Sequence, residues 1–368
     1  MMLLLCLPLF TIAFAKEDKI IKIPLMNSFD TYSIRLLPSS YPMKLILDLD
    51  FMIDYMWVFY NTYPIRNKKE NVILNTIIGN NSMADKTYDN FEIVRTSIQL
   101  INFPIHVLDD SNDMENYFDA FPLAYSFSNK NNSIIEYFYK NNMIEHKGFG
   151  IAKEKGQISS LLFIGGFADE VKKTFPHVTK CKIKNNQWGC KLDKVIINNH
   201  KEFKNSYEAV FQANHKEIFV PKEYNDYIYQ DIIRHYVENK TCSYNKNKEL
   251  YLCGCGIIYK FPTMNIIIDG ITFTFNAREL FSNYNKECEF NIISNKKNAN
   301  LWELGTIFLN KYVTYFDYDH SEIRFYTRKP LIKQNRPLHS SLMLCCIIFV
   351  IIGITNLVYI RVIKMFTK

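Results

Sequence analysis

The sequence lacks the residue patterns of several large functional classes. No set of histidines and cysteines at zinc-like spacing accompanies Cys253 and Cys255. The net charge of +7 is spread along the chain, without a basic helix or a basic patch interleaved with aromatic residues. No serine or cysteine stands in a pattern with histidine and aspartate that supports a nucleophile. We therefore predict no metal, no cofactor and no nucleic-acid partner.

The composition favours a large protein built mainly from β-strands. The chain has 368 residues, of which 48% are hydrophobic and 15% aromatic. A chain of this length can bury a large core and is expected to form two or three domains. Aromatic and β-branched residues favour strands. The fold class predicted from composition is therefore mainly β.

The first residues have the features of an export signal. Residues 1–15 are almost entirely apolar and end in Ala13-Phe14-Ala15, a small-x-small cleavage pattern just before charged residues. A basic segment before the apolar run is missing. A retained N-terminal strand or helix is the alternative. We predict a cleaved signal peptide over residues 1–15.

A second apolar run lies near the other terminus. Leu342–Ile360 spans about 19 residues, close to the ~20 that cross a bilayer. Basic residues follow it, including Arg361 and Lys364, so the C-terminal side is expected to stay cytosolic. A buried core helix is the alternative. We predict a type I membrane protein with a stalk at 328–341, a transmembrane helix at 342–360 and a cytosolic tail at 361–368.

The cysteines and glycosylation sequons fit an exported body. An even number of cysteines in an exported chain predicts three disulfides of open connectivity, and the asparagines of three sequons are candidate glycosylation sites. We predict a location in the secretory pathway or at the cell surface, with the body lumenal or extracellular. The cysteines are Cys181, Cys190, Cys242, Cys253, Cys255 and Cys288, and the sequon asparagines are Asn80, Asn131 and Asn239.

Two related stretches organise the chain. Met43–Val58 reads MKLILDLDFMIDYMWV, in which an apolar strand carries Asp48 and Asp50. Glu208–Pro221 reads EAVFQANHKEIFVP, in which an apolar strand again runs into a polar turn. Burial of a carboxylate in such a strand is costly unless the group is paired or used. Solvation of both carboxylates at a loop mouth is the alternative.

The two stretches resemble the active-site loops of pepsin-like aspartic proteases, specifically the eukaryotic, membrane-anchored type. The resemblance implies a bilobal fold with a central cleft between an N-terminal lobe (16–170) and a C-terminal lobe (171–327). It places Asp50 at the first catalytic aspartate and Gln212 at the second. Phe51 and Ala213 occupy the positions of the family's threonines, and Met52 and Asn214 those of its glycines.

The resemblance extends over most of the body. Val72–Ile93 resembles the flap hairpin, with Ile78 and Gly79 at its tip in place of the family's tyrosine. Met264–Phe275 and Leu301–Tyr326 resemble the second-lobe hairpin and the terminal strands. By the same resemblance, Cys255 is expected to pair with Cys288.

The family's mechanism uses two carboxylates that share one proton, and a glutamine cannot replace one of them. A substitute acid could come from Asp48, Asp54 or Glu217, whereas His215 is expected to be a solvated loop residue. The leading hypothesis is a pseudoprotease whose cleft binds an extended peptide or a protein. One alternative is an active, atypical aspartic endopeptidase that uses Asp50 with a nonstandard partner. The other is a structural subunit whose groove is filled.

Overall fold

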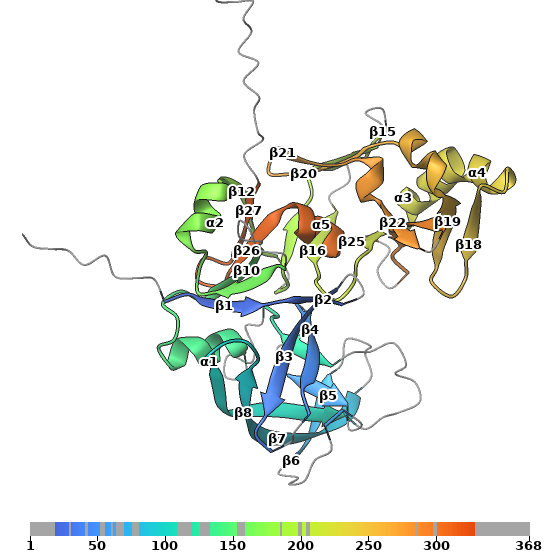
Figure 1. Ribbon diagram of the computed structural model, residues 1–368. Helices are drawn as coiled ribbons and strands as arrows, with labels where there is room; N and C mark the ends of the chain where they lie inside the picture. The colour runs from blue at the N-terminus through green and yellow to red at the C-terminus, as the bar shows by residue number, and fades with distance from the viewer. Residues whose placement is uncertain are drawn as a thin grey trace, which may run out of the picture. The chain divides into compact units, whose positions relative to one another are not determined.

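A computed structural model describes most of the body of the chain (Figure 1). The predicted signal peptide, the flap tip Ile78-Gly79, the sequon residues Asn80 and Asn131, and everything after Thr327 lie outside the described residues. Among the residues that are described, no helix is long and apolar enough to cross a membrane. The described ranges are 19–28, 31–40, 43–51, 56–59, 62–63, 70–75, 81–108, 119–125, 133–152, 159–184, 186–197, 201–203, 207–284, 286–296 and 300–327.

An eight-stranded sheet holds the first of the two organising stretches. Its order is β2-β3-β4-β9-β5-β8-β7-β6, and β3 also pairs with β7. Strands β6 and β7 form the antiparallel hairpin predicted over Val72–Ile93. The strands are β2 (Met26–Ser28), β3 (Thr31–Pro38), β4 (Leu45–Asp50), β5 (Trp57–Phe59), β6 (Glu70–Asn75), β7 (Asn81–Ile93), β8 (Gln99–Leu108) and β9 (Ala120–Pro122).

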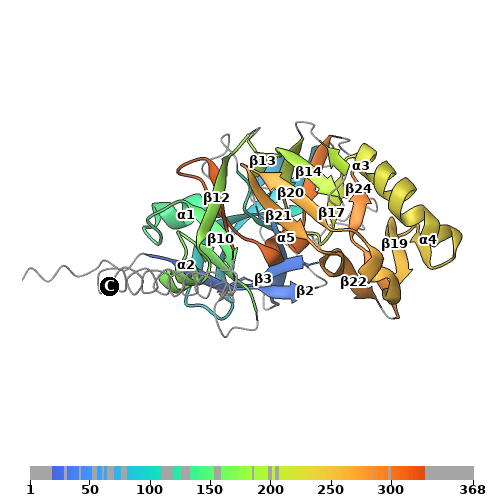
Figure 2. The same cartoon turned by 90° about the horizontal axis from the view of Figure 1, so that it is seen from above.

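A six-stranded sheet joins segments that are distant in the sequence. Its order is β1-β11-β10-β26-β27-β12, so three strands of the predicted N-terminal lobe lie beside three strands of the predicted C-terminal lobe. Figures 1 and 2 both show α2 beside β10 and β12, whereas α1, which overlaps them in Figure 2, lies near β8 in Figure 1. The elements are β1 (Ile21–Pro24), α1 (Ile134–Lys140), β10 (Gly148–Ala152), β11 (Leu161–Ile164), α2 (Asp169–Thr174), β12 (His177–Lys182), β26 (Val313–Asp317) and β27 (Glu322–Tyr326).

A five-stranded sheet of order β13-β16-β25-β17-β24 holds the second organising stretch. Strands β16 and β25 run parallel, so that Phe211 lies opposite Leu304. A short helix, α5, follows β25. The elements are β13 (Gly189–Lys191), β16 (Glu208–Phe211), β17 (Ile218–Val220), β24 (Ile292–Ser294), β25 (Leu301–Leu304) and α5 (Thr306–Lys311).

Two four-stranded sheets and a run of helical turns complete the body. Their orders are β15-β14-β20-β21 and β18-β19-β23-β22, and β20 and β21 form the hairpin predicted around the Asp-Gly turn. The elements are β14 (Lys194–Ile197), β15 (Lys201–Phe203), α3 (Lys222–Tyr227), η1 (Ile228–Ile233), α4 (Arg234–Glu238), β18 (Cys242–Asn245), β19 (Leu250–Gly254), η2 (Cys255–Lys260), β20 (Met264–Ile268), β21 (Ile271–Phe275), η3 (Ala277–Glu279), β22 (Phe281–Tyr284) and β23 (Glu287–Phe290).

Three disulfides form from the six predicted cysteines. They join Cys181 to Cys190, Cys242 to Cys253 and Cys255 to Cys288. The last is the pairing expected from the family resemblance. Two of these bonds, between β18 and β19 and between η2 and β23, cross-link the sheet β18-β19-β23-β22 and the turn beside it. Disulfides of this kind are typical of oxidising, exported environments.

Candidate functional site

The first organising stretch places its carboxylates on one face of β4. Leu45, Leu47 and Leu49 are fully buried, whereas Ile46 is 48% exposed. Because side chains alternate along a strand, Asp48 and Asp50 share the face of Ile46. Burial increases along this face, from exposed Ile46 through half-buried Asp48 to Asp50, which is 5% exposed.

In the second organising stretch, Gln212 directly follows β16 and is 3% exposed. Its backbone N–H donates to the carbonyl of Leu304 at 3.0 Å, which anchors the turn to β25. The carbonyl of the next residue, Ala213, accepts from the N–H of Tyr32 at 3.2 Å. This last bond ties the second stretch to β3, the neighbour of the strand that carries Asp50.

The two stretches meet through two side-chain hydrogen bonds. Asn214 Nδ2 donates to Asp50 Oδ2 at 3.0 Å. The backbone N–H of Phe51 donates to Gln212 Oε1 at 3.3 Å. The structure thus brings together the turns that carry Asp50 and Gln212.

Phe51 holds the first stretch in place by packing its ring against other aromatic rings. The threonine that the family has at this position would use its hydroxyl group instead. Phe51 is 1% exposed, and its ring makes edge contacts with Phe149 and Phe316 at centroid distances of 5.1 and 4.8 Å. These two rings stack on each other and on the edge of Trp188. Aromatic pairs of this geometry add about 0.5–1.5 kcal/mol each beyond the area that they bury. The floor of the site is therefore rigid and apolar.

Three carboxylates lie close together around β4. Burial, followed by the negative charges of Asp119 and Asp50, raises the pKa of Asp48 to about 6. Asp119 precedes β9, and its Oδ1 accepts from the N–H of Phe59 at 2.9 Å and from the hydroxyl of Thr62 at 3.2 Å. The side of the site formed by the first stretch is therefore strongly negative.

Comparisons with known proteins agree with this geometry. The family model described as eukaryotic aspartyl protease matches residues 119–327, more than half of the chain. The chain belongs to the eukaryotic aspartyl protease family. The matched region includes Gln212 and the strands that support it, whereas Asp50 lies before it.

A solved structure extends the fold assignment of this family member to the first half of the chain. A crystal structure of the aspartic proteinase from Irpex lacteus matches with a TM-score of 0.65 at 10% sequence identity. The match covers 85% of this chain and 99% of that chain. Since the identity is so low, this likeness shows the bilobal fold alone. Among curated proteins, no sequence matches this one.

In this aspartyl protease family member, hydrogen bonds from Asn214 to Asp50 and from the N–H of Phe51 to Gln212 join the two central stretches. An amide holds no proton that it could exchange with a carboxylate, and the Oε1 of Gln212 already accepts from Phe51. The Oδ2 of Asp50 accepts from Asn214 Nδ2. The site lacks a second acid at the position opposite Asp50.

The other acids proposed as substitutes differ in their placement. Asp48 is electrostatically coupled to Asp50, but it lies two residues earlier on the same strand. The backbone carbonyl of Glu217 accepts from Gly305, which fixes the second stretch to the start of α5. Asp54 and Met52 lie outside the described residues. Of the three candidates, only Asp48 therefore has a described link to Asp50.

His215 differs from the solvated residue expected from the sequence. Its side chain is 18% exposed, and its Nε2 lies 3.8 Å from Glu303 Oε2. Its ring contacts Phe219 edge-on at 4.8 Å, and its Nδ1 lies 3.1 Å from the carbonyl of Glu217. The turn that follows Gln212 folds back onto β25, so His215 packs between this turn and that strand.

Sequence reasoning missed two members of the site. Asn214 was assigned to a position where the family has glycine, so its side chain was not expected to bind Asp50. Asp119 lies close to Asp48 because β4 and β9 pair in parallel, with Asp48 opposite Ala120. The sequence carries no periodic signal for this long-range pairing.

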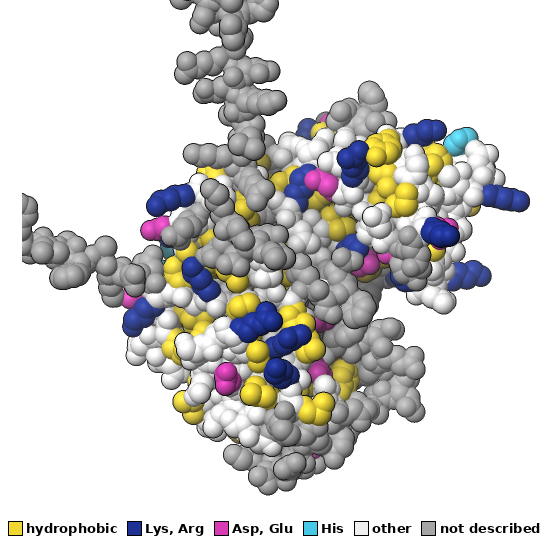
Figure 3. Space-filling model, viewed as in Figure 1, with side chains coloured by type: hydrophobic (Ala, Val, Ile, Leu, Met, Phe, Trp, Pro, Cys, Tyr) yellow, Lys and Arg dark blue, Asp and Glu magenta, His cyan; other side chains and the backbone are white. Residues whose placement is uncertain are grey.

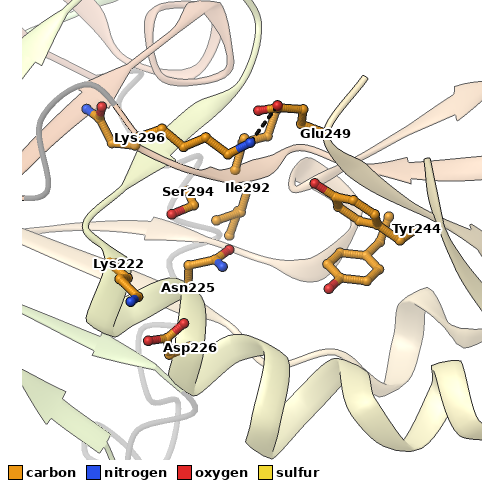
Figure 4. Close-up of a pocket in the computed structure, with 11 residues that line it drawn as sticks. Lys222, Asn225, Asp226, Tyr244, Glu249, Ile292, Ser294 and Lys296 are labelled. Atoms are coloured by element: carbon orange, nitrogen blue, oxygen red, sulfur yellow. Dashed lines mark hydrogen bonds and ion pairs between the residues drawn. The ribbon is translucent and has the colours of Figure 1, made fainter. Parts of the chain in front are cut away.

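A separate pocket of about 450 Å³ lies between α3, β24 and the β18–β19 hairpin (Figure 4). Lys222, Asn225 and Asp226 line one side of it, and Tyr244 lies on the other. None of its lining residues belongs to the Asp50 or Gln212 stretch. On the face shown in Figure 3, Lys and Arg side chains are dispersed among hydrophobic and acidic ones.

Proposed function

We propose that this protein is a non-catalytic member of the eukaryotic aspartyl protease family that binds an extended peptide or protein segment in the cleft between its lobes. The observation that carries the proposal is the pair of bonds between the two central stretches. Asn214 engages the Asp50 carboxylate, and Gln212 engages the Phe51 N–H. The side chains at both catalytic positions of the family, Asp50 and Gln212, are thereby used to join the two stretches.

The same bonds support a binding function. They keep the two central stretches together without the shared proton that a catalytic pair requires. A cleft of preformed strands offers backbone hydrogen bonds to an extended segment regardless of catalysis. The buried rings beneath Phe51 keep this cleft in one shape, which reduces the entropy cost of binding.

The proposed setting is the lumen of the secretory pathway or the cell surface, with attachment by a single span. The three disulfides support an oxidising compartment. The apolar run Leu342–Ile360 and the basic residues after it support the anchor. The predicted signal peptide over residues 1–15 supports export.

A peptide-library assay at pH 3 to 7 tests the proposal. The full-length protein is incubated with the library, and both cleavage and binding are measured for the wild type, Asp50→Ala and Gln212→Asp. We expect binding without cleavage in the wild type. We expect Gln212→Asp also to leave peptides intact, because Asn214 still engages Asp50 and Phe51 still occupies the threonine position.

The active-enzyme alternative predicts a different outcome. Pepstatin-sensitive cleavage at acidic pH that is abolished by Asp50→Ala would replace the binding function with an aspartic endopeptidase. The elevated pKa of Asp48, raised by burial and by Asp119 and Asp50, is the feature that favours this alternative, since it supplies a second acid near Asp50. Absence of both binding and cleavage would favour a structural subunit.

A further inference from the structure

The outward face of β4 presents an apolar residue followed by two acids. Ile46 is 48% exposed, Asp48 is half-buried and Asp50 is almost fully buried. Asp50 points to the second stretch, since it accepts from Asn214. The side chain of Asp48 leaves the same face of the strand two residues away. A peptide in the cleft beside Asp50 would therefore pass near Asp48.

Asp48 differs from Asp50 in the described contacts of its side chain. Throughout the described ranges, no hydrogen bond or ion pair reaches its carboxylate. Arg35 lies opposite Ile46 on β3, one step along the ladder, yet the described contacts contain no ion pair between Arg35 and Asp48. A partly buried carboxylate without a partner is energetically costly. Such a group is expected to serve a ligand.

Ser33 is an independent indication of a missing ligand. It lies directly opposite Asp48 in the antiparallel pair of β3 and β4, so both side chains share one face of the sheet. Ser33 is 0% exposed, and within the described part of the chain its Oγ has no hydrogen-bond partner. Buried hydroxyl groups are nearly always hydrogen-bonded, so an unsatisfied one beside an unpaired carboxylate points to a donor from outside.

The charges around Asp48 determine which kind of hydrogen-bond donor a ligand would present to it. Asp119 and Asp50 both act on Asp48 and make its surroundings more negative. Asp119 uses one oxygen for Phe59 and Thr62, and Asp50 is held by Asn214. The charged groups that act on Asp48 are thus Asp119, which precedes β9, and Asp50 on its own strand, whereas Arg35 on β3 pairs with Ile46 and makes no described ion pair with Asp48. An added anion would be repelled, and an added cation would be attracted.

We propose that Asp48, Ser33 and Asp119 form an acidic subsite of the cleft that receives the cationic side chain of a lysine or arginine in the bound peptide. The proposal rests on the proposed binding function and specifies its ligand class. A lysine ammonium has three donors, which suit the Asp48 carboxylate and the Ser33 hydroxyl. Its aliphatic stem can lie along exposed Ile46, as long basic side chains do on apolar surfaces.

Matched peptides test this subsite. A positional library of acetylated octapeptides is first screened for binding to the full-length protein. The best lysine-containing peptide is then compared with its norleucine and glutamate versions, using the wild type, Asp48→Asn and, as a control, Asp169→Asn. Asp169 is a suitable control because its side chain is 75% exposed on α2. Circular dichroism verifies that each variant is folded.

We expect the wild type and Asp169→Asn to bind the lysine peptide about tenfold more tightly than the norleucine peptide, and the glutamate peptide least of all. We expect Asp48→Asn to bind the lysine and norleucine peptides almost equally. Peptide binding without a preference for lysine, or a preference that survives Asp48→Asn, would overturn the acidic subsite and leave cleft binding intact. If no peptide binds to any variant, the proposed binding function itself fails.

Should Asp48→Asn fail to fold, Ser33→Ala provides the second test. It removes only the unsatisfied hydroxyl and is expected to weaken binding of the lysine peptide about threefold, with little change for the norleucine peptide. Equal weakening of both peptides by Ser33→Ala would contradict the subsite, because it would indicate a general effect on the cleft.

Discussion

The carboxylates of β4 and those of the six-stranded sheet have opposite charged surroundings. In the sheet, Glu322 is 1% exposed and lies 2.7 Å from Arg324 Nε and 3.0 Å from Lys180 Nζ. Asp317 receives Arg324 Nη2 at 2.6 Å and His320 Nδ1 at 2.9 Å. On β4, the charges that raise the pKa of Asp48 are those of two acids, Asp119 and Asp50.

The pKa values follow this difference. Burial alone would raise the pKa of Glu322, but Arg324 and Lys180 outweigh it and hold that pKa at about 2. Burial and the charges of Asp119 and Asp50 raise the pKa of Asp48 to about 6. Buried acids that stabilise a fold are paired, whereas an unpaired acid in a cleft indicates a functional site. The following predictions test this contrast.

The largest effect is expected from removing the cation of the sheet. Arg324→Met leaves two buried carboxylates with fewer partners and should lower the free energy of unfolding by about 3 kcal/mol, as measured by urea denaturation. The control is Arg278→Met, because Arg278 is exposed and contacts only the ring and hydroxyl of Tyr259 in the described contacts. It should cost less than about 1 kcal/mol. Equal losses of stability in the two variants would contradict the claim that Arg324 stabilises the fold by pairing with buried acids.

An intermediate effect is expected at the junction of the lobes. Asn214→Ala removes the donor to the buried Asp50 carboxylate and should cost about 2 kcal/mol, in the range of hydrogen bonds to charged groups. The control is Asn225→Ala on α3, whose side chain makes no hydrogen bond within the described residues. Urea denaturation at pH 7 measures both. A change below about 0.5 kcal/mol for Asn214→Ala would show that this bond does not join the lobes.

The smallest effects concern pH, and they have opposite signs. The folded pKa of Asp48 exceeds its ordinary value of 3.8, so its ionisation costs stability as the pH rises from 4 to 6. The folded pKa of Glu322 lies below its ordinary value of 4.5, so its contribution is present above pH 4.5 and lost as the pH falls toward 2.

At pH 7, Asp48→Asn should therefore be more stable than the wild type and Glu322→Gln less stable, each by about 1 kcal/mol after allowance for solvent screening. The Asp48→Asn difference should disappear near pH 4, and the Glu322→Gln difference should shrink below that pH. Thermal unfolding across this range measures both. Parallel pH profiles for the two variants would contradict the opposite treatment of the two acids.

The sequence was sufficient for much of the fold because local patterns and turns specify its elements. The hairpins around the Asp-Gly turn and over Val72–Ile93 were predicted and are present. So are the terminal strands within Leu301–Tyr326 and the disulfide between Cys255 and Cys288. The division of the body at residue 170 and the membrane anchor stay predictions.

Site residues could be predicted only where they stand at a position that the family motif fixes in the sequence. Gln212 could be recognised because Pro221 fixes the register of its stretch. The bond from Asn214 to Asp50 could not, since it depends on how two distant turns approach each other. The role of Phe51 in the aromatic floor likewise depends on Phe149 and Phe316, which come from two other strands.

The pairing of β10 with β26 has a consequence for biosynthesis. Gly148 of β10 lies opposite Asp317 of β26. β10 is therefore synthesised long before the strand with which it pairs. Until the ribosome has released residues 313–317, the edge of β10 has no partner, and the nascent chain exposes a surface that invites aggregation. Such non-local topology also slows folding. Final folding must therefore follow synthesis of β26, and chains cut before Val313 should be retained by chaperones.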